Sequence, residues 1–168
     1  MTPTIESVRQ EHEQFQPYLE EIRAVADSVG RASTKSVLGR VAEIHEFLAH
    51  RLIPHAVAEG RLMLPLVRKL NGGPETAIGM NQCHVQLGQL TDQLESAVAR
   101  AHEKGMDHGT ESELRRILYG LHALLTAHFA QAEDVFTAAL ERDREPSKRA
   151  DLFEDVERSA EEISDQFE

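Results

Sequence analysis

A histidine and a glutamate four residues apart, His55 and Glu59, mark the stretch of this sequence that is best suited to chemistry. On an α-helix, residues at this spacing project from the same face, about one turn apart. A neutral imidazole and a carboxylate in that arrangement can bind a transition metal together. Leucines continue the same face above and below the pair, so the carboxylate is expected in an apolar seam. Burial there is costly unless a positive charge lies beside it.

Each of the other long helical stretches also carries a histidine on its apolar seam, namely His12, His84 and His128. If the helices are antiparallel neighbours, the rise of about 1.5 Å per residue brings all four histidines within about one or two turns of one level. For any single one, a core histidine bonded to a neighbour is the simpler interpretation. Four imidazoles and a carboxylate at one level predict a metal site. Nitrogen and oxygen ligands suit iron, with zinc or manganese as lesser options.

Four stretches with apolar residues at intervals of three and four must position these side chains. The first helix is expected over about residues 3–29, and the second from a cap at Ser33 or Thr34 to about residue 70. The third is expected to run from Pro74 to Gly105, and the fourth to begin at a capping box of Thr110 and Glu113 and to end before Pro146.

Four long helices joined by short connections predict an all-α protein, an up-down-up-down four-helix bundle. Pro54 and Pro65 interrupt the second helix, and we expect bends rather than ends because the apolar period continues through both. Residues 1–145 are expected to form the bundle. Residues 146–168 are expected to form a short acidic C-terminal helix on it, or a disordered acidic tail.

The composition excludes several classes of function. The 168 residues suggest one domain, and their formal net charge of -11 leaves no basic stripe for nucleic acid. The single cysteine, Cys83, excludes an internal disulfide and suits a reducing compartment. With no secretory leader and no membrane-spanning stretch expected, we predict a cytoplasmic protein without membrane contact. No sequence pattern indicates a hydrolase triad, a phosphate-binding loop or a pocket for a large organic substrate.

The order of these ligand types resembles the hemerythrin-like (HHE) domain family over about residues 8–140. The segment PHAVAEGRLMLP resembles the second-helix signature of that family, and LHALLTAHFAQAEDVF resembles its fourth-helix signature. The resemblance implies a four-helix bundle with two iron ions, bridged by an oxo or hydroxo group and by carboxylates. The metal ligands that it implies are His12, His55, Glu59, His84, His128 and Glu133.

The sequence departs from the family pattern at two positions. Many HHE domains have an acid four residues after the fourth-helix histidine, but here that residue is Ala132 and the acid is Glu133. A regular helix turns Glu133 about 140° away from His128. Respiratory hemerythrins nevertheless place their acid at this spacing, so we expect Glu133 to bridge the metals. Hemerythrins that carry oxygen have a second third-helix histidine where this chain has Gly88, so one iron is expected to have an open position.

The remaining candidates have two interpretations each. Tyr18 is expected to pack in the core, although its phenolate could complete the open iron. His45 is expected at the edge of the core or beside a ligand. His122 is expected outside the site, although it could be a metal ligand or lie beside one. His50 is expected at the periphery unless the bend at Pro54 turns it inward, and His102 and His108 are expected in loops. Cys83, about 100° round the helix from His84, is expected to be a small buried hydrophobe.

The resemblance implies a small oxidant as the ligand: hydrogen peroxide, oxygen or nitric oxide. An open metal position favours binding or reduction of that oxidant over reversible carriage, and a catalase-like or peroxidase-like activity is one option that the sequence leaves open. The alternatives are an oxygen or redox sensor or carrier, and an iron-handling protein without catalysis. The ferritin-like proteins use Glu-x-x-His pairs and more carboxylates than imidazoles, which disfavours iron handling here.

Overall fold

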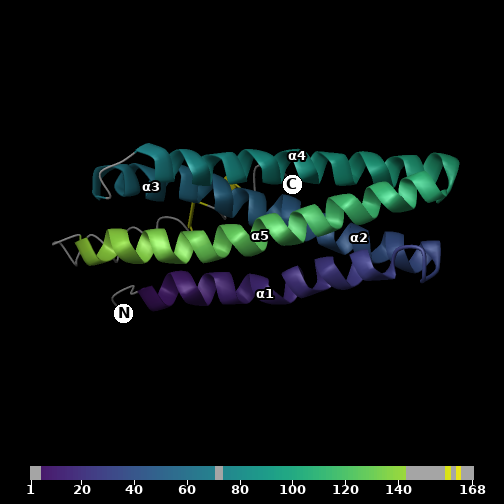
Figure 1. The fold of residues 1–168 in the computed structure, drawn as a ribbon, viewed down its shortest axis with the longest axis horizontal. Helices are drawn as coiled ribbons and strands as arrows, with labels where there is room; N and C mark the ends of the chain where they lie inside the picture. The colour runs from purple at the N-terminus through teal and green to yellow at the C-terminus, as the bar shows by residue number, and fades with distance from the viewer. Residues whose placement is uncertain (1–4, 71–73, 143–157, 160–161, 164–168) are drawn as a thin grey trace.

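The computed structural model describes residues 5–70, 74–142, 158–159 and 162–163 (Figure 1). The regular elements in these ranges are all helical. In chain order they are α1 (Ile5–Ser28), α2 (Thr34–Phe47), the π-helical turn η1 (Leu48–Leu52), α3 (Ile53–Leu70), α4 (Pro74–Lys104) and α5 (His108–Arg142). The predicted all-α fold is therefore confirmed.

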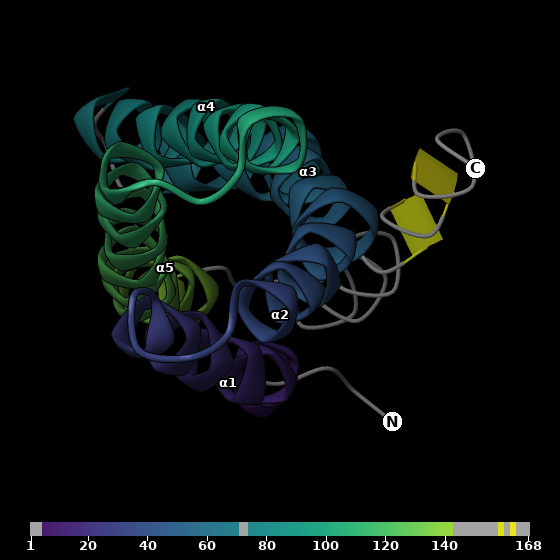
Figure 2. The ribbon, with the colours of Figure 1, turned by 90° about the vertical axis from the view of Figure 1, so that its right-hand side faces the viewer.

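The helices form a bundle in which α2, η1 and α3 together make one of the four sides. Seen end-on, these sides surround a common centre in the order α1, α2–α3, α4, α5 (Figure 2). Each side packs against the next, and α5 closes the ring by packing on α1. The chain reverses direction at each short connection, as the up-down-up-down prediction requires (Figure 1).

The π-helical turn explains how the second side of the bundle continues through a proline. Pro54 has no backbone N–H, and in a regular helix its ring would clash with the carbonyl of His50. The backbone N–H of Ile53 donates to the carbonyl of Leu48, five residues back, which widens the turn just before Pro54. A π turn holds an extra residue, so the inward face shifts by about 100°. As a result, both Phe47 before the turn and His55 after it are buried.

The helix ends follow the expected chemistry at three of four positions. Gly30 and Gly105 follow α1 and α4 with φ of 78° and 87°, a left-handed conformation that glycine adopts without strain. Ser33 caps α2, because its hydroxyl accepts a hydrogen bond from the backbone N–H of Ser36. The predicted capping box at the start of α5 is wrong.

Asp107 caps α5 instead of that capping box. The helix begins at His108, and the carboxylate of Asp107 accepts a hydrogen bond from the backbone N–H of Thr110 at 2.7 Å. Glu113 is drawn to another partner, because its carboxylate accepts a hydrogen bond from the guanidinium of Arg100 at 2.5 Å. An aspartate three residues before a threonine gives the same capping geometry as the predicted box, one turn earlier.

The apolar core fills the centre of the bundle along α1, α2 and the facing parts of α4 and α5. Its fully buried members include Ile22, Ile44, Leu48, Leu94 and Leu118. Ile44 is buried and His45 is half-buried, as expected for a histidine at the edge of the core. The core thus anchors one half of the bundle, and the histidines lie towards the other half.

Several predictions fall on residues outside the described ranges. The boundary near residue 145 and most of the C-terminal helix or tail are among them, so the domain division stays a prediction. Within residues 158–163, the described positions are helical and Ile163 is buried. Of the helices that the structure describes, none combines the length and the apolar character needed to cross a membrane.

Candidate metal centre

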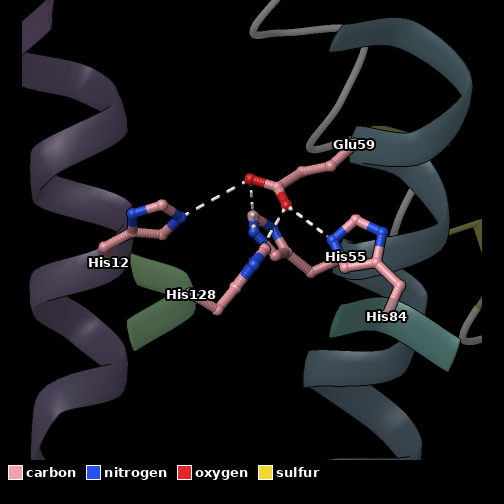
Figure 3. A network of polar contacts seen from close by, with 5 residues as sticks. All are labelled: His12, His55, Glu59, His84 and His128. Carbon is pink, nitrogen blue, oxygen red and sulfur yellow. Dashed lines mark ion pairs between the residues drawn. The ribbon is translucent and has the colours of Figure 1, made fainter. Parts of the chain in front are cut away.

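Glu59 lies at the centre of the four seam histidines (Figure 3). Its Oε1 lies 3.5 Å from Nε2 of His12 and 3.3 Å from Nε2 of His55. Its Oε2 lies 3.3 Å from Nε2 of His84 and 3.3 Å from Nε2 of His128. Each carboxylate oxygen therefore faces one pair of imidazoles, and every imidazole uses the same nitrogen.

All four sides of the bundle contribute to this cluster. His55 and Glu59 lie one turn apart on α3, in the turns that follow Pro54. His12 and His84 lie early in α1 and α4, whereas His128 lies late in α5. Because α5 is antiparallel to α1 and α4, these positions meet at the same end of the bundle, as their depth along the sequence predicts.

The distances between the donor atoms fit a bound metal better than hydrogen bonds. Two atoms that each lie about 2.1 Å from one ion, at octahedral to tetrahedral angles, are about 3.0–3.4 Å apart. The contacts of Glu59 are 3.3–3.5 Å long, whereas N–H···O hydrogen bonds favour about 2.7–3.2 Å. The ligand atoms form two groups, His12–His55–Glu59 and Glu59–His84–His128, within each of which they lie less than 4.8 Å apart.

Burial makes these polar atoms costly unless a cation accompanies them. Glu59 is only 2% exposed. Within the described part of the chain, Oε2 of Glu59, both ring nitrogens of His12 and Nε2 of His84 are buried and make no hydrogen bond. Burial by itself raises the pKa of the Glu59 carboxyl, but His55 foremost, with His12 and His128, outweighs burial and holds that pKa well below its ordinary value. Glu59 is therefore a buried carboxylate, and cations between it and the imidazoles would satisfy its Oε2 and the Nε2 atoms of His12 and His84.

Comparison with known protein families agrees with this geometry. The hemerythrin HHE cation-binding domain family matches residues 4–140, which is most of the chain. The chain belongs to this family. The matched range contains all four histidines and Glu59, so the cluster is compatible with the metal-binding site that an HHE domain implies. Comparisons with curated proteins and with solved structures gave no significant match.

Two phenylalanines line the candidate metal site on the side of α1. The ring of Phe129 stacks on His12, with centroids 4.6 Å apart, and Phe15 meets His55 edge-on at 5.3 Å. Both phenylalanines are buried and pack against this pair of imidazoles. Phe15 lies three residues after His12, an interval that places both on one helix face, whereas the only signal of Phe129 in the sequence is its position directly after His128.

Two cavities reach the metal site from opposite sides of the bundle. One of about 420 Å³ lies between α3 and α4 and is lined in part by His84. The other, of about 400 Å³, lies between α1 and α5 and is lined in part by His12 and Glu133. No sequence pattern predicts either cavity, because a space between two helices leaves no motif.

The structure brings five of the six predicted ligands together and places Glu133 beside them. Glu133 lies outside both ligand groups, half-buried in the wall of the α1–α5 cavity that it shares with His12. Ala132, at the position of the usual family acid, is fully buried. The role of Glu133 as a metal ligand stays a prediction.

The other candidates lie away from the two ligand groups. Tyr18 stacks on Phe47 with ring centroids 3.8 Å apart, and its hydroxyl accepts a hydrogen bond from Arg51, as expected for a packing residue. His45 and His122 are half-buried, and Nε2 of His50 lies 3.4 Å from Oε2 of Glu46. The prediction of loops at His102 and His108 is wrong, because these exposed residues lie in the last turn of α4 and at the start of α5. Cys83 is half-buried, not buried as predicted.

Proposed function

We propose that this HHE-domain protein holds two iron ions and binds or reduces a small oxidant: hydrogen peroxide, oxygen or nitric oxide. The position of Glu59 carries the proposal. Each of its oxygens, with the pair of imidazoles that it faces, supplies three ligands, so one carboxylate serves two ions. Imidazole and carboxylate ligands suit iron, with zinc and manganese as alternatives. When bound, such a pair of irons would supply the redox chemistry for the oxidant.

The protein contributes ligand positions and control of access. Glu59 would hold both ions through its two oxygens, and Glu133 is proposed as a second carboxylate at the His12 side. The His84–His128 pair has space beside it, because Gly88 lies one turn after His84 and a Cβ added there meets no atom within 4 Å. We propose that the ion held by this pair has the open position at which the oxidant binds. Cytoplasmic location is proposed from the single cysteine, Cys83, which suits a reducing compartment.

Iron content and peroxide consumption together test this function. Protein made in iron-supplied cells should contain about two irons per chain and absorb in the near ultraviolet through charge transfer to iron. It should convert hydrogen peroxide to water and oxygen, and His55→Ala should lose this reaction. His102→Ala, a histidine exposed on α4, is the matched control and should behave like the unmodified protein. Gly88→His should slow the reaction by filling the open position.

Two results would contradict the proposal in different ways. Stoichiometric zinc, with no absorbance after anaerobic ferrous loading and reoxidation, would refute the di-iron centre. A stable, reversible oxygen adduct without peroxide consumption would leave the centre in place and make the protein a carrier or sensor.

A further inference from the structure

The cavity between α3 and α4 has a composition that the binding of a small oxidant does not require. Its volume is about 420 Å³, many times that of peroxide. Its walls are mostly apolar, and Val57 and Val85 remain 36% and 53% exposed on α3 and α4. Small-molecule sites combine such apolar walls with a few polar groups that fix orientation.

One of these polar groups is the outer edge of a metal-binding histidine. Gly60 lines the cavity, and a Cβ at that position would lie 3.8 Å from Nδ1 of His84. Any side chain longer than alanine would therefore grow over this nitrogen, so glycine leaves it open to the cavity. When Nε2 of His84 binds a metal, the proton of the neutral ring must be on Nδ1, which becomes a donor.

This donor has no protein partner in the described ranges, although metal-binding histidines nearly always donate the second ring N–H to a carboxylate, a carbonyl or water. Two further donors line the same cavity, the guanidinium of Arg61 and the amide of Asn81. Arg61 makes no ion pair with any described residue, in a chain whose formal net charge is -11. A cation left unpaired on so acidic a protein favours an anionic ligand.

We propose that the α3–α4 cavity binds a short-chain monocarboxylate. Its carboxylate accepts hydrogen bonds from Nδ1 of His84 and from Arg61, and its hydrocarbon chain packs against Val57 and Val85. The inference rests on the proposed function in one respect, because a metal on Nε2 is what fixes the proton on Nδ1. The bound carboxylate in turn makes His84 a more basic ligand, so carboxylate and metal strengthen each other's binding equally. The cavity is then a regulatory site for the metal centre.

Calorimetric titration of the metal-loaded protein with acetate, butyrate and hexanoate tests this proposal. Affinity should rise with chain length, by up to about fourfold per methylene. Butanol should bind at least about tenfold more weakly than butyrate, because it lacks the charge that Arg61 and His84 recognise. Azide, which binds the open metal position, should not compete with butyrate. Competition would place the carboxylate on the metal itself and overturn the proposal.

Variants with matched controls test which residues bind the carboxylate. Arg61→Gln should weaken butyrate binding at least about tenfold, whereas Arg68→Gln, two turns further along α3, should not. Gly60→Leu should block the cavity, whereas Gly39→Leu on the exposed part of α2 should leave binding unchanged. Val85→Thr should remove most of the chain-length dependence.

Metal content measured on the same samples separates the two proposals. Two bound metals without butyrate binding would overturn the carboxylate site alone. Absence of bound metal would refute the proposed di-iron function, and equal butyrate affinity with and without metal would refute the coupling through His84.

Discussion

Glu59 differs from the histidines around it because both ligand groups share its carboxylate. Each oxygen faces a different pair of imidazoles, at 3.3–3.5 Å. A histidine belongs to only one pair, so its loss should affect one ion first. Loss of the charge on Glu59 should affect both of the proposed ions, because they would then lose their common anion.

Glu59→Gln is therefore expected to lose more metal than any single histidine variant. Glutamine keeps the shape of the side chain and removes its charge, so iron content should fall from about two per chain to well below one. His84→Ala should retain about one. Elemental analysis measures both, with Glu46→Gln as the control, since that exposed glutamate pairs with His50 outside the metal-ligand cluster. Full iron content in Glu59→Gln would show that the carboxylate does not bridge.

The sequence could predict the parts of the site that follow from the geometry of a single helix, but not those that depend on how the helices pack. The His55–Glu59 pair is fixed by the helix itself, and the depth of the other histidines follows from rise per residue in antiparallel helices. The place of Glu133 depends on how far α5 is rotated about its own axis. The packing of the whole bundle sets that rotation, with Ala132 buried and Glu133 half-buried beside the cavity.

At the level of elements, the second side of the bundle, formed by α2, η1 and α3, shows a similar limit to prediction from sequence. The apolar period continues through Pro54 and predicts one long helix, which the structure confirms. A simple kink and a π turn both relieve the clash of a proline ring, and the sequence pattern does not distinguish them. The π turn matters for the site because it sets the face that α3 presents, and therefore the direction of His55 and Glu59.

The start of α5 offers a test of one helix end that depends on pH. Hydrogen bonds from the backbone and side chain of Thr110 lower the pKa of the Asp107 carboxyl in the folded protein. The stabilisation from this carboxylate is therefore complete above the unfolded-state pKa and is lost as pH falls through the lowered folded-state pKa. Asp107→Ala should be less stable than the unmodified protein at neutral pH, and the difference should shrink in acid.

Asp107→Asn is the matched control for this prediction, measured by urea unfolding across the same pH range. Asparagine keeps an oxygen that can accept from Thr110 but does not titrate. It should retain much of the cap and lose the pH dependence. A stability difference between Asp107→Ala and the unmodified protein that stays constant from neutral pH into acid would show that the charge of Asp107 contributes nothing to the cap.

On the scale of the whole molecule, the metal site and the apolar core hold different halves of the bundle. The core cluster runs through α2 and the parts of α1, α4 and α5 that face it. At the other end, ligands from α1, α3, α4 and α5 converge on one buried carboxylate (Figure 3). Bound metal therefore joins all four sides where the apolar core contributes least, and its removal leaves a buried charge among four imidazoles.

Metal removal should accordingly lower stability and do so unevenly along the bundle. Metal at about a thousand times its dissociation constant adds about 4 kcal/mol, which raises the Tm of a chain of this size by about 8–16 °C. Calorimetry with and without chelator measures the shift. Hydrogen exchange should show faster opening around His12, Glu59 and His128 in the metal-free protein, while amides near Ile22 and Leu118 keep their protection. A uniform loss of protection would mean that the bundle unfolds as one unit, and an unchanged Tm would mean that metal does not hold its four sides together.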